Sequence, residues 1–368
     1  MTLPNIIQLF TTPSNIHKLS LENWQTLIRV LRGNDLLASF YYLLDRELLL
    51  NHVPHFALKH LESAEIYAKR QTQQIHLESE SLVQFLGNAD IQPIFLKGAA
   101  YVLRKDINHY GRVMSDIDIL VPYSQLSLIE NILKQNDWVE KTLDDYDEQY
   151  YRQWAHELPP YQHIYRGTTL DIHHTLLPPI SGKLIPENEL LSNLQTTNDG
   201  YLTLSPELII LHSVIHLFYN EDFTKSFRDV WDIHLLLMEL EKHSDLTSLI
   251  KLSERLGFSD TLYIALKLRD KIFSTSSLGN YHRAQSSLHL LNYRYSKWTD
   301  LFINNVIYFA ILPSHDLVDS YWSRCSRFIM FIRGHVLKMP LKILLPHLAR
   351  KSYRYLVTLL LGRYHYEK

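Results

Sequence analysis

The chain has 368 residues, which exceeds the usual size of a single hydrophobic core and favours two or three packed units. Hydrophobic residues make up 46% and charged residues 21%, which is typical of a folded globular protein and excludes a disordered chain. Cys325 is the only cysteine, so an intramolecular disulfide is excluded and we expect a reducing, cytoplasmic setting. The opening MTLPNIIQLFTTPSN lacks the features of a signal peptide, and no window reaches the roughly 18 apolar residues of a membrane span.

The first region, residues 1–88, is predicted to be helical. Trp24 and Leu31 belong to a pattern of apolar residues at helical spacing. A second, longer amphipathic pattern begins near residue 55 and ends at Gly87, a residue type that commonly ends helices.

The middle region, residues 89–205, is predicted to be a compact α+β unit with short strands. IQPIFLKG indicates a strand that turns into a helix at Gly98, and DIDILV and WVEKT indicate two further strands. Ser124 is the expected N-cap of the helix QLSLIENILKQN. PYQHIYR and TLDIHHTL alternate on either side of Gly167, a pattern that suits a β-hairpin.

The last region, residues 206–368, is again predicted to be helical. From Tyr321 onward ten Lys or Arg residues face a single Glu, a balance of +9, so the residues before Tyr321 carry −11. This basic tail interleaves its charges with Leu, Ile and aromatic residues. It is expected either to dock on the acidic remainder of the chain or to make peripheral contact with an anionic membrane surface at the inner membrane face. The fold class expected is therefore a small mixed-sheet α+β core flanked by helical N- and C-terminal regions.

The stretch RVMSDIDILV places two aspartates at the start of an apolar strand. Residues i and i+2 of a strand share a face, so Asp116 and Asp118 are expected to lie side by side. Two carboxylates this close repel each other and resist leaving water. A divalent cation between them would remove both difficulties.

Other charged residues are expected at the same edge of the sheet. Lys97 and Gly98 stand where a strand turns into a helix, and the free N–H groups of a helix N-terminus favour anions. Arg112 adds positive charge just before the two aspartates, and Asp171 in LDIHH supplies a third carboxylate from a later strand. A phosphate-binding turn beside three carboxylates suits Mg²⁺, with Mn²⁺ as an alternative, and phosphoryl or nucleotidyl transfer.

FLKGAA, RVMSDIDILV and LDIHHTL together resemble the nucleotidyltransferase superfamily related to DNA polymerase β, and most closely a poorly characterised bacterial branch of it. The resemblance runs from about Trp24 to about Leu237. It implies that Asp116 and Asp118 ligate Mg²⁺ in a catalytic site, that Asp171 completes this metal site and helps to activate the acceptor hydroxyl, and that Gly98 lines the triphosphate. Lys97 and Arg112 are expected to bind the nucleotide phosphates through their positive charge. The chain departs from many relatives at Ala99, where they carry Ser or Gly, and in a longer spacer between Gly98 and Asp116. The residues expected to support the site are His156, His173 and Arg228.

Each of these interpretations has a simpler alternative. Asp116 and Asp118 could be solvated carboxylates at a strand entry, or the Asp-x-Asp motif of a glycosyltransferase, although nothing before Ile91 indicates the βαβ unit that such an enzyme presents. Asp171 could simply be an acidic residue at the edge of a hairpin. Lys97 and Arg112 could each be an ordinary partner in a surface ion pair.

The histidines and the later helix also have structural explanations. His156 and His173 could be buried structural histidines, and His212 and His216, four residues apart, are expected to face the core. Arg228 and Asp232 are also four residues apart and are expected to pair with each other. Arg228 could instead help close the site over a nucleotide.

The function predicted from these residues is Mg²⁺-dependent transfer of a nucleoside monophosphate from an NTP to an acceptor hydroxyl. The acceptor is left open, and no specific nucleic-acid-binding motif is recognised. The alternative is a non-catalytic nucleotide-sensing or scaffold protein that uses its basic tail to bind a membrane surface or a partner.

Overall fold

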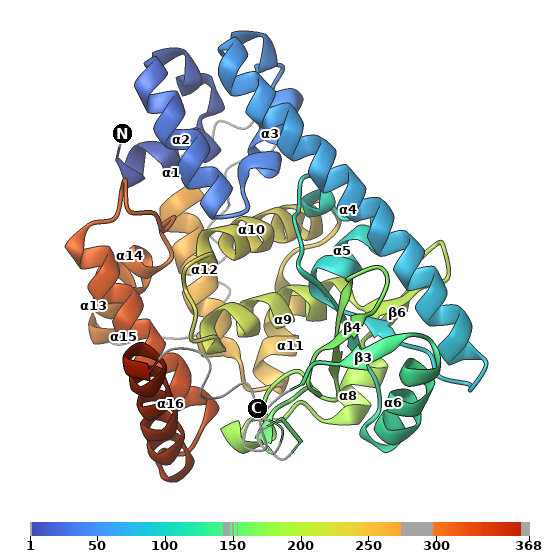
Figure 1. The fold of residues 1–368 in the computed structure, drawn as a ribbon. Helices are drawn as coiled ribbons and strands as arrows, with labels where there is room; N and C mark the ends of the chain where they lie inside the picture. Colours follow the sequence, from blue (N-terminus) through green and yellow to red (C-terminus); the bar gives the residue numbers. More distant parts are fainter. Residues whose placement is uncertain (1, 143–147, 149–150, 153, 274–296, 362–368) are drawn as a thin grey trace.

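The computed structural model describes residues 2–142, 148, 151–152, 154–273 and 297–361 (Figure 1). It is an α+β fold in which one mixed sheet is flanked by helical N- and C-terminal regions, which confirms the predicted fold class. The predicted divisions near residues 88 and 205 stay a prediction. One hydrophobic core includes residues from all three regions.

The N-terminal region is helical, as predicted, and Figure 1 shows its longest helix, α4, extending from the other N-terminal helices to the sheet. The Oγ atom of Ser20 caps α2 by accepting a hydrogen bond from the backbone N–H of Asn23. The helices of this region are α1 (Leu3–Thr11), α2 (Leu21–Gly33), α3 (Leu37–Arg46) and α4 (His55–Gly87), with 3₁₀ turns at Pro13–Lys18 and Leu50–His52.

A seven-stranded mixed sheet forms the centre of the fold, with strand order β3-β4-β5-β2-β1-β7-β6. Strand β2 lies in the middle, pairing parallel with β5 on one side and antiparallel with β1 on the other. The strands are β1 (Ile94–Phe95), β2 (Asp116–Leu120), β3 (Trp138–Glu140), β4 (Tyr161–His163), β5 (Thr169–His173), β6 (Leu194–Thr196) and β7 (Leu202–Leu204). The helices among them are α5 (Lys97–Arg104), α6 (Leu126–Gln135) and α8 (Glu187–Ser192).

Most local predictions for this sheet are confirmed. β4 and β5 pair antiparallel around Gly167, as the hairpin pattern predicted. The prediction for Ser124 was wrong, because a 3₁₀ turn at Tyr123–Gln125 precedes α6 and the residue in the N-cap position is Gln125. Ser124 lies inside that turn, and its side chain caps nothing at the helix start.

The C-terminal region is helical, as predicted, and packs α9 and α10 against each other beside the sheet (Figure 1). Ser205 caps α9 by accepting from the backbone N–H of Leu208. The helices are α9 (Pro206–Tyr219), α10 (Ser226–His243), α11 (Thr247–Arg255), α12 (Ser259–Phe273), α13 (Lys297–Phe302), α14 (Tyr308–Ala310), α15 (Tyr321–Lys338) and α16 (Leu341–Leu361), with a π-helical turn at Ile303–Ile307.

The basic tail makes contacts with the rest of its own chain. Arg333 donates to the backbone carbonyl of Phe218 at 2.6 Å, and Lys338 pairs with Glu221. Both partners lie at or just after the end of α9, so at least part of the tail's charge is used within the molecule. Peripheral membrane contact by this tail stays a prediction, and Arg363 and Lys368 lie outside the described residues.

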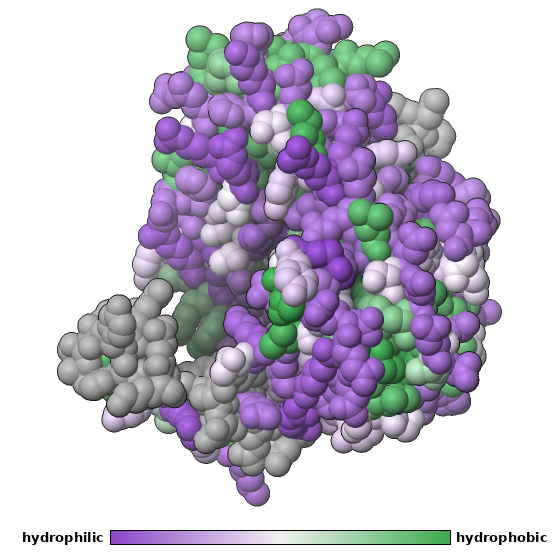
Figure 2. Space-filling model, turned by 45° about the vertical axis from the view of Figure 1, so that its right-hand side comes forward, coloured by the Kyte–Doolittle hydropathy of each residue, from purple (hydrophilic) through white to green (hydrophobic). Residues whose placement is uncertain are grey.

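On the face shown in Figure 2, hydrophilic side chains predominate and hydrophobic ones gather in small separate patches. Among the helices that the structure describes, none combines the length and the apolar character needed to cross a membrane. The cytoplasmic location stays a prediction.

Candidate active site

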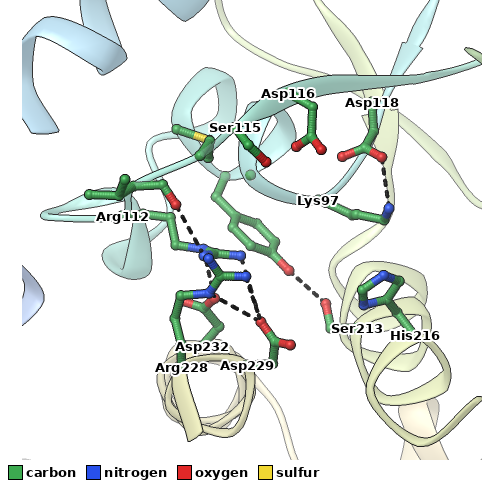
Figure 3. A pocket seen from close by; sticks show the side chains of 14 residues that line it. Lys97, Arg112, Ser115, Asp116, Asp118, Ser213, His216, Arg228, Asp229 and Asp232 are labelled. Carbon is green, nitrogen blue, oxygen red and sulfur yellow. Dashed lines mark hydrogen bonds and ion pairs between the residues drawn. The ribbon is translucent and has the colours of Figure 1, made fainter. Parts of the chain in front are cut away.

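The two aspartates of RVMSDIDILV lie side by side, as Figure 3 shows. Asp118 is paired in register with Asp171 of the parallel strand β5, and Asp116 is two residues earlier on the same face of β2. Parallel pairing places the side chains of partner residues on the same side of a sheet. All three predicted metal ligands are therefore brought together at the centre of the sheet.

Lys97 points at this carboxylate group from the N-terminus of α5 (Figure 3). Its Nζ atom lies 2.7 Å from Oδ1 of Asp118, and its backbone has a positive φ of 45°. The first N–H groups of α5 have no partner within the helix, and Lys97 and Gly98 line the same pocket. Lys97 and Gly98 thus lie where the sequence predicted a phosphate-binding turn.

Gly98 packs closely against the side chain of Met114. A Cβ atom at this position would lie 2.3 Å from Sδ of Met114, so a larger residue would require the Met114 side chain to move. The loop before β2, which contains Met114, is fixed from the other side by Gln71 of α4. Its side-chain amide donates to the carbonyl of Met114 at 2.7 Å and accepts from the N–H of Met114 at 2.9 Å.

His173 also contacts the central carboxylate. It lies two residues after Asp171 on the same face of β5, and its Nε2 is 2.9 Å from Oδ1 of Asp118. His173 is 1% exposed. His156 lies beside it, with the two ring centroids 5.1 Å apart, so both predicted supporting histidines are at the site.

The three carboxylates differ in their affinity for protons. Burial raises the pKa of Asp171 to about 8, and the charges of Asp118 and Glu157 contribute to the increase. Burial and the charge of Asp118 also raise the pKa of Asp116. Burial acts in the same direction on Asp118, but the ion pair with Lys97 and the hydrogen bond from His173 hold its pKa below the usual value. Asp118 is thus the permanent negative charge of the group, and the other two carboxylates resist ionisation beside it.

The opposite wall of the pocket is formed by α10. Nε of Arg112 lies 2.8 Å from Oδ2 of Asp232, and both side chains are almost fully buried. Arg228 pairs with Asp229 at 3.4 Å and with Asp35 at 3.3 Å. The predicted pair between Arg228 and Asp232 was therefore wrong. Arg112, from the loop before β2, lies beside Asp232, whereas Arg228 contacts Asp35 of the N-terminal region.

Arg112 and Arg228 both line the pocket, as Figure 3 shows, but their charges are matched by carboxylates of α10. Direct binding of phosphate by Arg112 stays a prediction. To bind phosphate, the guanidinium of Arg112 would have to contact the phosphate in addition to Asp232 and Asp229.

Several residues that line the pocket were not predicted from the sequence or were expected elsewhere. Ser213 and His216 of α9 line the pocket, and the hydroxyl of Tyr101 is 2.7 Å from Oγ of Ser213. His212 is buried, as expected, but the half-buried His216 contributes to the pocket wall. The four-residue spacing could not predict which of the two histidines lines the pocket, because both lie on an apolar helix. Glu157 was also missed, although its position next to His156 was a usable signal.

Asp116, Asp118 and Asp171 could hold a divalent cation. Oδ1 of Asp171 is buried and has no hydrogen-bond partner in the described part of the chain. Asp116 and Asp171 resist ionisation beside Asp118, and a bound cation would favour their charged forms. Carboxylate oxygens are the ligands that Mg²⁺ prefers. The donor set therefore fits Mg²⁺.

The fold and the site define a class of protein: an α+β protein whose central strand carries Asp-x-Asp beside a third aspartate and a helix N-terminus. Residues 20–274 match the model of a family described as uncharacterised nucleotidyltransferase. The match covers more than half of the chain, and the chain belongs to this family, which confirms the predicted resemblance. Searches of curated proteins and of solved structures gave no significant match.

Proposed function

We propose that the protein transfers a nucleoside monophosphate from an NTP to an acceptor hydroxyl and that Mg²⁺, or Mn²⁺ in its place, is bound by Asp116, Asp118 and Asp171. The observation that carries the proposal is the parallel register of β2 and β5, which sets Asp118 beside Asp171 at the N-terminus of α5. Membership of a nucleotidyltransferase family supports the reaction class.

The phosphate-binding side of the pocket is assigned to α5. Lys97 and the free N–H groups near Gly98 offer positive charge and hydrogen bonds to the triphosphate. A bound cation would neutralise charge that develops on the phosphate oxygens. When the triphosphate arrives, Lys97 has Asp118 on one side and phosphate on the other. It can therefore hold the donor close to the carboxylates.

The acceptor side is assigned to Asp171. The acceptor oxygen attacks the α-phosphorus, the bond to the β-phosphate breaks, and pyrophosphate leaves. The hydroxyl proton passes to the carboxylate of Asp171. Asp171 is assigned this role because its Oδ1 is buried and has no hydrogen-bond partner among the described residues, so it is open to accept a proton. His216 and Ser213 form the wall that faces the strand carboxylates and are the residues placed to contact an acceptor.

The test follows pyrophosphate release and label transfer from α-labelled ATP, CTP, GTP and UTP with Mg²⁺ or Mn²⁺. A cell extract supplies acceptors. The wild-type protein is expected to transfer label, and the Asp116→Asn/Asp118→Asn double variant is expected to lose the transfer. The matched control is Asp90→Asn, because Asp90 is exposed and its positive φ is readily adopted by Asn.

The same experiment separates the enzyme from the nucleotide-sensing or scaffold alternative. A wild-type protein that binds metal and nucleotide but releases no pyrophosphate with any of the four substrates would contradict the catalytic proposal. It would favour the sensing protein. Label transfer that persists in the double variant would remove the assignment of these two aspartates.

A further inference from the structure

A second group of metal-binding side chains lies next to the three aspartates. It consists of His156, Glu157 and His173, whose ligand atoms all lie within 4.8 Å of one another. Oε2 of Glu157 is 3.4 Å from Nε2 of His173 and 3.9 Å from Nε2 of His156. None of the three was predicted as a metal ligand from the sequence. The group combines two imidazoles with one carboxylate.

Backbone pairing holds this group in place. Glu157 forms an antiparallel bridge with His173, and the N–H of Leu158 donates to the carbonyl of Ile172 at 2.9 Å. On the other side of the bridge, the N–H of His174 donates to the carbonyl of His156 at 2.9 Å. The three side chains thus come from the end of β5 and from a segment hydrogen-bonded to it, which limits their freedom to move apart.

The spacing of the ligand atoms suits a tetrahedral ion. Zinc binds nitrogen and oxygen at about 2.0–2.2 Å, so two ligands at a tetrahedral angle lie roughly 3.4 Å apart. The two distances to Glu157 are close to this value and need only small side-chain adjustments. Imidazole nitrogen favours Zn²⁺ and neighbouring transition metals, whereas Mg²⁺ prefers oxygen.

The two imidazoles also have unused nitrogen atoms. Nδ1 of His156 and Nδ1 of His173 are buried and have no hydrogen-bond partner among the described residues. The unpaired Nδ1 atoms are not the atoms nearest Glu157, but on each ring Nδ1 can carry the proton while Nε2 stays free to bind a metal.

We propose that His156, Glu157 and His173 bind a transition-metal ion of the Zn²⁺ class at a site separate from the Asp116, Asp118 and Asp171 group. Nε2 of His173 now contacts Asp118, and it cannot donate a proton and ligate a metal at once. Metal binding therefore moves the His173 proton from Nε2 to the unpaired Nδ1. Asp118 then loses the hydrogen bond from His173 and keeps its ion pair with Lys97.

The test uses the full chain after chelator treatment and titrates it with Zn²⁺ by calorimetry and with Co²⁺ by visible absorption, in excess Mg²⁺. One equivalent is expected to bind, with the intense absorption of tetrahedral Co²⁺. His156→Gln and Glu157→Gln are each expected to weaken the affinity at least about tenfold. The control His174→Gln, at the residue that follows the end of β5, is expected to leave it unchanged.

Two results would overturn the inference. The first is unchanged affinity in both His156→Gln and Glu157→Gln, with thermal melting of the metal-free variants matching the wild type. The second is binding that is lost in Asp116→Asn but kept in His156→Gln, because the ion would then belong to the aspartates. Neither readout depends on nucleotidyl transfer, so failure here leaves the proposed function standing, and loss of that function leaves this site standing.

Discussion

The two walls of the pocket carry similar residues but balance their charges differently. On the strand wall, Asp116 and Asp118 line the pocket with Asp171 paired beside Asp118, and Lys97 contacts Asp118 directly. On the helix wall, Asp229 and Asp232 of α10 are matched by Arg112 and Arg228.

An acidic cluster therefore does not identify a cation site by itself. The helix wall is already neutralised within the protein, and its carboxylates serve to hold the loop before β2 against α10. On the strand wall, burial and the charge of Asp118 raise the pKa values of the other two carboxylates, and Oδ1 of Asp171 is buried with no hydrogen-bond partner within the described ranges. This difference is what assigns the metal to the strand wall, and it can be tested by changing each wall in turn.

The largest effect is expected from changing one aspartate on each wall. Asp116→Asn should lower nucleotidyl transfer by about a thousandfold, because metal stabilisation is worth several kcal/mol in the transition state. Asp229→Asn should leave Mg²⁺ affinity within about twofold, since the partners of Asp229 in the described part of the chain are Arg112 and Arg228. Calorimetric Mg²⁺ binding and pyrophosphate release measure both variants. Equal loss of Mg²⁺ affinity in the two would remove the distinction between the walls.

The second prediction concerns the stability of the helix wall. Arg112→Met leaves Asp232 buried and without its ion-pair partner, which should lower the free energy of unfolding by about 3–5 kcal/mol. The double variant Arg112→Met/Asp232→Leu removes both charges and should recover most of that loss. Urea denaturation compares the three proteins. A single variant as stable as the wild type would show that this pair does not hold the wall.

The smallest expected effect concerns pH and the strand wall. The pKa of Asp171 is about 8 in the folded protein and close to 3.8 in an unfolded chain. Between these values the folded state binds more protons than the unfolded state, so the metal-free protein loses stability as the pH rises through this window. Asp171→Asn removes that loss and should stabilise the metal-free protein at pH 8 by roughly 1–3 kcal/mol.

Thermal melting of wild type and Asp171→Asn at pH 5 and pH 8, without metal, measures this effect. The gain should be larger at pH 8 than at pH 5. It should shrink when Mg²⁺ is added, because Mg²⁺ stabilises the wild-type carboxylate group and the variant lacks one ligand. A gain that is the same at both pH values would contradict the raised pKa.

The sequence by itself determined the α+β class, the helical regions on both sides and the three aspartates. These depend on local patterns: residues i and i+2 of a strand share a face, so Asp116 and Asp118 had to lie together once DIDILV was recognised as a strand. The hairpin around Gly167 was similarly local. The resemblance to nucleotidyltransferases connected these residues with Asp171.

Only the tertiary structure decided which charges meet across long distances in the chain. Arg112 and Asp232 are far apart in sequence, and spacing along α10 wrongly favoured Arg228 as the partner of Asp232. The placement of Glu157 beside His173 likewise depends on a bridge to β5 that no local pattern specifies. Local periodicity fixes which face a residue occupies within its own element, whereas the packing of elements fixes which faces meet, and charge balance at this site depends on the second.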